Sequence, residues 1–477
     1  MTSNAQLQMM DQSGRVPPAQ AIYSDLLAVS YPARKRQVEF TASNGDTFDS
    51  SKNTIEIPIA IGGAEWIDLS NSYFKITITS KTGANKTIGF KSPHDIIERL
   101  QFLGTNSEML EDIQNYNNLA RMLMFHQLGE DGLTYNTNLG EFQESTLFKS
   151  PTAVAGDAAA IVASANVAFN QVTGATDALG VGSHHGQTNF TTKIANDGSI
   201  TICFPLICGI CSTNKYLPLG MLKNRSLTLR VQLARDVKAF TCADNTAPVA
   251  NYSGVALVAD VITMAETYNE KFMNMIRSVG DISIHYTTYK NYADNKQAVN
   301  ADTTYDGLIP DSSRSLKSLF TIFNKQSEAN NTDALQLVNP ELQSYQYTIL
   351  SETYPQKDVQ NVSATNRNQA FANLHIALGQ LGSISSRCMG SSESYYASGD
   401  TAKANVNSST FALGVCCESH NKSSNLLESG KNLQNSTQPC RLRAVINNNN
   451  TALSILHYSL SDRLLLIDES GNLRSSG

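Results

Sequence analysis

The chain has 477 residues, of which 41% are hydrophobic and 16% charged, and its formal net charge is −6 with a pI near 5.8. This length and hydrophobic content predict a globular protein of two or three domains. The small negative charge excludes a broad basic surface that would bind nucleic acid directly.

No stretch of the sequence carries a clear targeting or membrane signal. The start, MTSNAQLQMMDQSGR, has neither a cationic segment nor an apolar core, so we expect no signal peptide. The stretch TAVAGDAAAIVASANVAF is interrupted by Asp157 and Asn166 and is too polar to span a bilayer. The eight cysteines form no recognisable disulfide framework, and a reduced intracellular compartment is the simpler interpretation.

Alternation of apolar and polar residues predicts many short strands. In 73–79, Phe74, Ile76 and Ile78 fall on one side of the strand, and a lysine and two threonines fall on the other. The same pattern predicts the other strands, at 37–41, 55–61, 199–204, 226–234, 255–264, 281–287, 344–350, 411–417, 441–446 and 453–467. Short strands separated by Gly, Asn and Ser turns favour all-β sandwiches or barrels.

Two segments show helical spacing instead. In 108–127, apolar residues recur from Met109 through Ile113 and Tyr116 to Leu123, which predicts one helix over the whole segment. In 366–381, Phe371, Leu374, Leu378 and Leu381 form a similar stripe.

The order of these elements repeats. In the first half, the strand at 73–79 precedes the first helix and the strands at 226–234 and 255–264. In the second half, the strand at 344–350 precedes the second helix and the strands at 441–446 and 453–467. We therefore match 73–79 with the strand near 345. The halves differ mainly by an Ala/Gly-rich loop insertion near 150–198. We infer two β domains of like topology, 27–268 and 269–477, after an N-terminal arm, 1–26.

Several stretches carry a family resemblance: WIDLSNSYFKITIT, IIERLQFLGTNSEMLEDIQNYNNLARML, YLPLGMLKNRSLTLRVQLA, VALVADVITM, SYQYTILSETYP, LESGKNL and LHYSLSDRLLLIDESGNL. In their order and texture they resemble the double jelly-roll major capsid proteins of the PRD1 and adenovirus lineage. The resemblance is greatest to the hexon-like proteins of virophages, Polinton-type elements and adintoviruses. It spans about 25 to 470.

The resemblance implies two tandem eight-stranded jelly rolls with short helices in the insertions between strands. It also implies a homotrimer that forms a pseudo-hexagonal capsomer of an icosahedral virion shell, with neighbouring capsomers and with penton and minor capsid proteins as partners. The segments 150–198 and 384–410 are then candidates for exposed loops. Residues 1–26 resemble the arms that reach adjacent capsomers, and a frayed terminus is the other interpretation.

Candidate chemical sites are weak. Cys203, Cys208 and Cys211 lack a second close pair, so buried apolar thiols are favoured over zinc. His184 and His185 lie in a Gly-rich segment that is typical of an exposed loop. ESGKNL lacks the first glycine of a phosphate-binding loop and has Asn432 where Ser or Thr would bind magnesium. We expect no catalytic, cofactor-binding or metal-binding residues and no enzyme activity.

Two alternative interpretations of the chain stay open. One is a secreted or surface β-sandwich binding module, such as a glycan-binding or receptor-binding fiber or spike. Another is an enzyme whose acids or histidines are distant in the sequence and meet only in the folded chain.

Two short features have local interpretations. The basic run Arg34-Lys35-Arg36 could face a shell interior or act in nuclear import, and a solvated turn is favoured. Trp66, the single tryptophan, is expected to anchor a core or an interface.

Overall fold

The structure is a computed structural model that describes residues 31–127, 192–326, 335–381, 410–419, 429–446 and 452–476, with short gaps inside these ranges, and Tyr395. The expected arm and most of the segments 150–198 and 384–410, with His184 and His185, lie outside the described residues.

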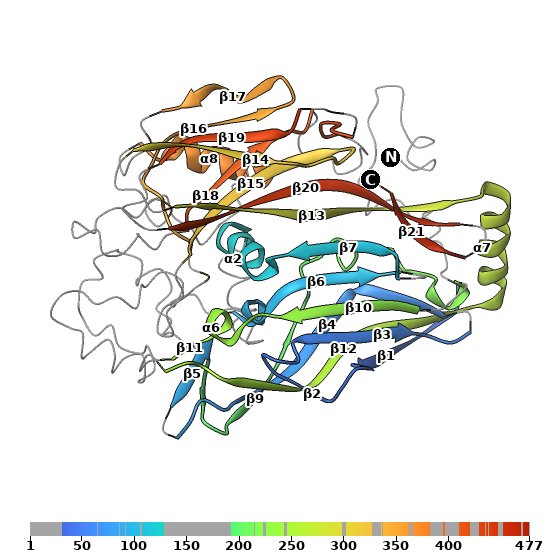
Figure 1. The fold of residues 1–477 in the computed structure, drawn as a ribbon. Coiled ribbons are helices and arrows are strands. Elements are labelled where there is room, and N and C mark those ends of the chain that lie inside the picture. The colour runs from blue at the N-terminus through green and yellow to red at the C-terminus, as the bar shows by residue number, and fades with distance from the viewer. Residues whose placement is uncertain are drawn as a thin grey trace, which may run out of the picture.

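The first half of the chain forms two antiparallel sheets that we call the first sandwich (Figure 1). One sheet has the order β1 (Ala33–Thr41), β12 (Ala250–Met264), β4 (Glu65–Ser80) and β9 (Ser199–Phe204), and β2 (Thr47–Phe48) also pairs with β12. The other has the order β3 (Thr54–Ala60), β10 (Ser226–Leu233), β6 (Ile97–Leu103) and β7 (Met109–Gln114). A small sheet joins β11 (Thr241–Cys242), β5 (Thr87–Phe90) and β8 (Thr192–Ala195).

The second half repeats this plan, and we call it the second sandwich. Its first sheet has the order β13 (Ile282–Lys296), β20 (Leu453–Ile467), β15 (Leu316–Lys325) and β18 (Ala412–Cys416), and β21 (Leu473–Ser476) pairs with β20. Its second sheet has the order β14 (Thr303–Ile309), β19 (Cys440–Ile446), β16 (Leu342–Ile349) and β17 (Glu352–Val359). The all-β prediction is confirmed.

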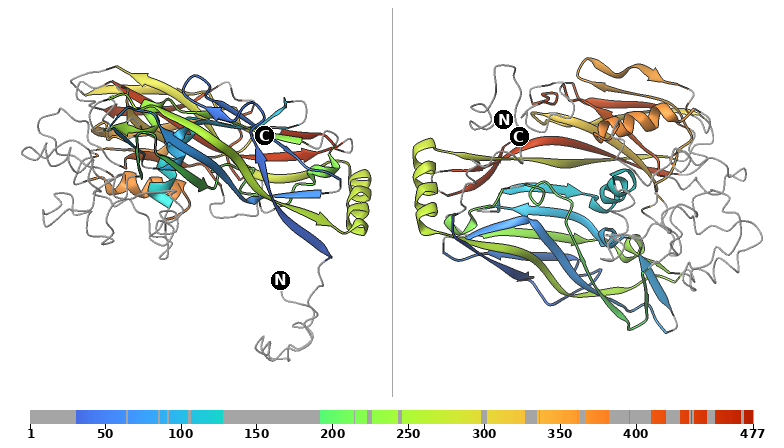
Figure 2. Two further views of the ribbon diagram at one scale, coloured as in Figure 1. Left: turned by 90° about the horizontal axis from the view of Figure 1, so that it is seen from below. Right: turned by 180° about the vertical axis from the view of Figure 1, so that it is seen from behind.

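Short helices occupy the connections between strands. They are α2 (Tyr116–Gln127), α6 (Asp236–Ala239), α7 (Glu266–Val279), α8 (Asn368–Ala377) and the 3₁₀ turns η2 (Pro93–Ile96) and η4 (Leu219–Met221). Helix α7 stands at one end of the molecule and links β12 to β13, as both views of Figure 2 show. The expected domain boundary at 268 falls inside this helix. No helix among the described residues is long and apolar enough to cross a membrane.

The predicted alternation in 73–79 is confirmed and belongs to the longer strand β4. Phe74, Ile76 and Ile78 are fully buried between the sheets, and the Phe74 ring packs edge-on against Phe204 with centroids 5.7 Å apart. Burial of such side chains is the main stabilising contribution to a sandwich core.

The predicted helix over 108–127 is wrong in its first part. Residues Met109–Gln114 form β7, which pairs with β6 in a register that places Ile113 opposite Leu100. Asn115 adopts a left-handed backbone (φ 49°), and α2 begins at the next residue. The apolar residues recur at helical spacing, but this segment forms a strand because its backbone pairs with β6. Met109, which the helix would bury, is exposed.

The proposed match between 73–79 and the strand near 345 is also wrong. The two sheet orders make β15 the counterpart of β4, whereas β16, which contains Tyr345, corresponds to β6. Two isolated bridges confirm this match. Ile67 of β4 pairs with Leu217 in the first sandwich, and Leu316 of β15 pairs with Lys431 in the second. The matches of β10 with β19 and of β12 with β20 agree with the prediction.

The basic run Arg34-Lys35-Arg36 does not form a turn. It lies in β1 opposite residues 261 to 263 of β12, with Lys35 Nζ 2.5 Å from Asp260 and Arg36 Nη2 3.0 Å from Glu65. Pairing with β12 therefore holds this run in a strand although its charges favour a solvated turn. The three side chains are exposed on the edge strand of the first sheet.

Candidate functional site

The two sandwiches meet where β7 and α2 of the first lie against β13 and β20 of the second (Figure 1). The strands β13 and β20, each of 15 residues, extend past their own sandwich and run beside β7. We call this contact the sandwich junction.

A buried carboxylate lies at the centre of the sandwich junction. Glu111 of β7 accepts hydrogen bonds from the backbone N–H groups of Gly209 (2.8 Å) and Ile210 (3.1 Å) in the loop after β9. It also accepts one from the Thr288 hydroxyl of β13 (2.8 Å). Burial raises the pKa of Glu111, while these donors and Arg463 oppose the shift. Glu111 thus joins three segments that are distant in the sequence.

The backbone of the loop after β9 also lies very close to the backbone of β13. A Cβ atom on Gly209 would lie 1.9 Å from the carbonyl oxygen of Thr287, so only glycine fits there. The Tyr286 hydroxyl of β13 donates to the carbonyl of Leu110 in β7 (2.7 Å). The β13 strand therefore lies directly on the edge of the first sandwich.

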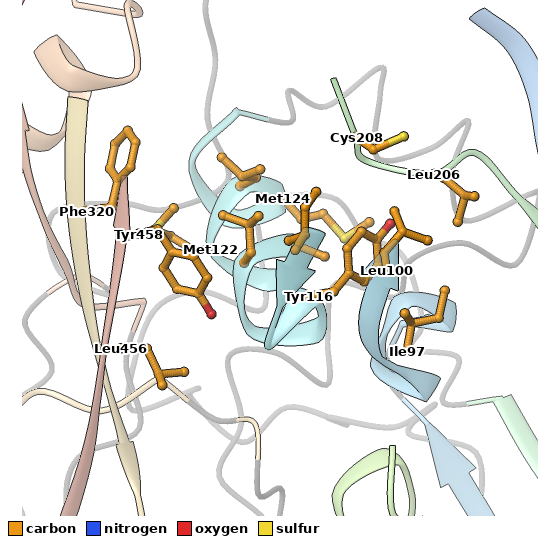
Figure 3. Close-up of a cluster of buried hydrophobic side chains, with 14 of the residues drawn as sticks. Ile97, Leu100, Tyr116, Met122, Met124, Leu206, Cys208, Phe320, Leu456 and Tyr458 are labelled. Carbon is orange, nitrogen blue, oxygen red and sulfur yellow. The ribbon is translucent and has the colours of Figure 1, made fainter. Parts of the chain in front are cut away.

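Helix α2 fills the space between the sandwiches. Figure 3 shows Met122 on the side of α2 toward Phe320, Leu456 and Tyr458 of the second sandwich, and Leu100 of the first sandwich on the opposite side of the helix. At its start, the carbonyl of Asn115 accepts from the Tyr458 hydroxyl (2.9 Å). A helix with apolar side chains on both sides is buried rather than amphipathic.

The end of α2 meets an aromatic cluster from the second sandwich. His126 is fully buried, and its Nε2 lies 2.8 Å from the carbonyl oxygen of Thr410. Its ring centroid is 5.6 Å from that of His375 on α8 and 6.3 Å from that of Tyr395. Burial lowers the pKa of His126 to about 3, so the imidazole is neutral at pH 7.

Helix α7 borders a groove at the end of the molecule. Trp66 donates its indole N–H to Asn269 (2.9 Å) and packs edge-on against Phe272 with ring centroids 4.6 Å apart. The prediction that Trp66 anchors a core or interface is therefore confirmed. The groove has a volume of about 870 Å³ and lies between this helix, the loop after β9 and the start of β13, where Ile284 lines it.

The weak candidate sites from the sequence do not converge. Cys208 and Cys211 are buried in the loop after β9, on either side of the two residues that bind Glu111. Burial raises the pKa of the Cys208 thiol well above its usual value. Cys203 is half-buried on β9. Lys431 of ESGKNL pairs with Glu352 (2.8 Å). Within the described ranges, no three His, Cys, Asp or Glu side chains are grouped to hold a metal ion.

The sequence analysis missed Glu111 and His126. Glu111 hydrogen-bonds a residue 98 positions away, and His126 bonds one 284 positions away. No local pattern marks such contacts, since only the fold brings the partners together.

No protein-family model matches the chain, and no curated protein matches it. Solved structures do resemble it over almost its full length. The VP54 protein of PBCV-1, fitted into a reconstruction of the virophage Sputnik, aligns with a TM-score of 0.58 at 10% identity, covering 95% of this chain and 99% of that chain. The fold is a double jelly roll.

Two further structures share the double jelly roll. A chain of the Sputnik virophage aligns with a TM-score of 0.54 at 12% identity, covering 97% of this chain and 92% of that chain. The Faustovirus major capsid protein aligns with a TM-score of 0.54 at 10% identity, covering 94% of each chain. At these identities the likeness establishes the double jelly roll, and the two sandwiches described above are its two rolls.

Proposed function

We propose that the chain is a major capsid protein that assembles as a homotrimeric, pseudo-hexagonal capsomer of an icosahedral virion shell. The observation that carries this proposal is the double jelly roll itself, which covers nearly the whole chain and matches capsid proteins of PBCV-1 and Faustovirus. The role is structural and not enzymatic, with neighbouring capsomers and with penton and minor capsid proteins as partners.

The repeated architecture supports the trimer. Each chain supplies two sandwiches with the same strand order, so three chains supply six similar units around one axis. A threefold axis closes such a ring through one heterologous contact, in which each copy uses two different sides. A binding module of the fiber or spike type gives no reason for two like sandwiches in one chain, and the comparisons do not favour it.

We also propose a division of the chain into an arm (1–26), a first roll (27–268) with its insertion near 150–198, and a second roll (269–477). The end of β12 at Met264 and the start of β13 at Ile282 support this division, with α7 as the connector.

The test is the mass of the purified full chain in solution by light scattering, followed by negative-stain imaging. We expect a species of three times 51.8 kDa with a hexagonal outline. A monomer, or a dimer of elongated particles, at every accessible concentration and salt would overturn the proposal.

A further inference from the structure

The groove beside α7, which we call the α7 groove, is bordered by apolar side chains that solvent reaches. Seven large hydrophobic side chains are exposed among the described residues, and three of them, Tyr31, Tyr216 and Met275, gather at this end of the molecule. Tyr216 and Met275 line the α7 groove itself, together with half-buried Tyr268 and Phe272. Exposed apolar side chains that cluster in this way mark a site where another segment binds.

The described chain begins at the rim of the α7 groove. The Tyr31 hydroxyl accepts a hydrogen bond from the ammonium group of Lys271 on α7 (3.1 Å), and the Tyr31 ring centroid is 5.3 Å from that of Tyr268. The Tyr268 ring in turn lies against Trp66, with ring centroids 5.7 Å apart, and both of these rings line the groove. A row of aromatic rings therefore leads from the first described residue into the groove.

The sequence just before Tyr31 is apolar. Residues 21–29 read AIYSDLLAV, in which Asp25 is the only charged residue, whereas residues 1–20 are richer in polar side chains. A single serine separates 21–29 from Tyr31, and nine residues span up to about 30 Å when extended. The segment 21–29 is therefore attached at the rim and is long enough to reach across the α7 groove of its own chain.

The charge of the α7 groove complements this segment. The described residues that line it include exposed Lys215 and half-buried His285 but no aspartate or glutamate. His285 is already paired with Asp462 (2.9 Å), which leaves Lys215 to face the carboxylate of Asp25. An apolar segment with one carboxylate thus meets an apolar surface with one ammonium group and no like charge.

We infer that residues 21–29 dock in the α7 groove of the same chain, with their apolar side chains on Tyr216 and Met275 and with Asp25 beside Lys215. Attachment at Tyr31 holds the segment near the groove at an effective concentration in the millimolar range, so even a weak contact is formed. The contact goes beyond the proposed function and does not depend on it, because it is made within one chain.

The experiment measures whether the α7 groove is occupied in the full-length chain. The probe is a fluorescein-labelled peptide, AIYSDLLAV, and its binding is followed by fluorescence polarisation. In the wild type the attached segment competes with the peptide, whereas Ile22→Ser/Leu26→Ser, the open variant, removes that competition. For an effective concentration of about 1 mM and a peptide Kd of about 0.1 mM, we expect the open variant to bind the peptide about tenfold more tightly than the wild type.

Further substitutions in the open variant locate the bound peptide. Met275→Glu places a carboxylate on the apolar surface and is expected to weaken peptide binding about tenfold or more. Leu308→Glu is the matched control, because Leu308 is similarly exposed (51% against 43% for Met275) but lies on β14, outside the groove. Lys215→Glu is expected to weaken binding about fivefold, and an Asp25→Lys peptide recovers it. Thermal unfolding confirms that all variants are folded.

Four outcomes would overturn the inference. Equal peptide affinities of the wild type and the open variant would mean that the attached segment does not cover the α7 groove. An open variant that binds no peptide at about 1 mM would show that the groove does not accept this sequence. Binding that Met275→Glu leaves unchanged would place the peptide elsewhere. A wild type that gains peptide affinity on dilution would assign the groove to the segment of a second copy.

Discussion

Removing the guanidinium of Arg121 is expected to destabilise the first sandwich strongly. Arg121 of α2 binds Asp95 of η2 through two bonds, Nε to Oδ1 (2.8 Å) and Nη2 to Oδ2 (2.7 Å). The two side chains are 3% and 0% exposed. Arg121→Met leaves a buried carboxylate without its partner, which costs about 3–5 kcal/mol of the free energy of unfolding.

The chain offers a matched control in Arg99, which binds Asp112 with the same two-bond geometry at 2.7 Å and 2.7 Å. This pair is 34% and 23% exposed, so water competes for it and Arg99→Met is expected to cost at most about 1 kcal/mol. Burial is therefore the main difference between the two variants.

The assay is urea unfolding followed by the fluorescence of Trp66, the single tryptophan, which lies in the first sandwich. With an m-value of about 2.5 kcal/mol/M, Arg121→Met lowers the midpoint by about 1–2 M, and Arg99→Met lowers it by less than about 0.4 M. The double variant Arg121→Met/Asp95→Asn is expected to lose less than the two single losses combined. Equal midpoint shifts for the buried and the exposed pair would refute this reasoning.

Gly209→Ala is expected to lower the thermal unfolding temperature, because its Cβ would overlap the Thr287 carbonyl at the sandwich junction, with a cost of about 1–3 kcal/mol or more. Gly62→Ala, where a Cβ meets no atom within 4 Å, is the control, and equal melting temperatures would contradict the close approach. For His126, the folded-state pKa of about 3 lies below the ordinary 6.5, so its contribution to stability is full above pH 6.5 and is lost as the pH falls toward 3. His126→Gln is therefore expected to show a smaller loss of melting temperature between pH 7 and 4 than the wild type, and an unchanged loss would assign the acid sensitivity elsewhere.

The sequence predicted the strands that have one face in the core and one in solvent. The strands β4 and β10 follow this rule, and their alternation could be read directly. By contrast, β15 was not predicted, because its sequence LKSLFTIFNK is apolar on both faces. Helix α8 covers its outer face, where the Ser318 hydroxyl donates to the carbonyl of Ala377 (3.0 Å). A strand that is buried on both faces does not show the alternation of apolar and polar residues that marks a half-buried strand.

Helix α7 was not predicted either, because the residues that it packs against are distant in the sequence. Its apolar contacts are made with Trp66, which lies about 200 residues earlier and pairs with Asn269 across a sequence distance of 203. Its own sequence, ETYNEKFMNMIRSV, is largely polar. The candidate site depends even more on such distant contacts, so the sequence indicated the repeat and the family resemblance but not the residues of the sandwich junction.

The length of β13 and β20 means that the two halves of this chain are not interchangeable building blocks. A first half on its own would uncover β7, which is the last strand of its sheet, and would deprive the Glu111 carboxylate of the Thr288 hydroxyl. Recombination between related genes within the α7 connector would therefore yield a folded product only if the incoming half brought strands of matching length and a partner for that carboxylate. We therefore expect the two halves to be inherited together.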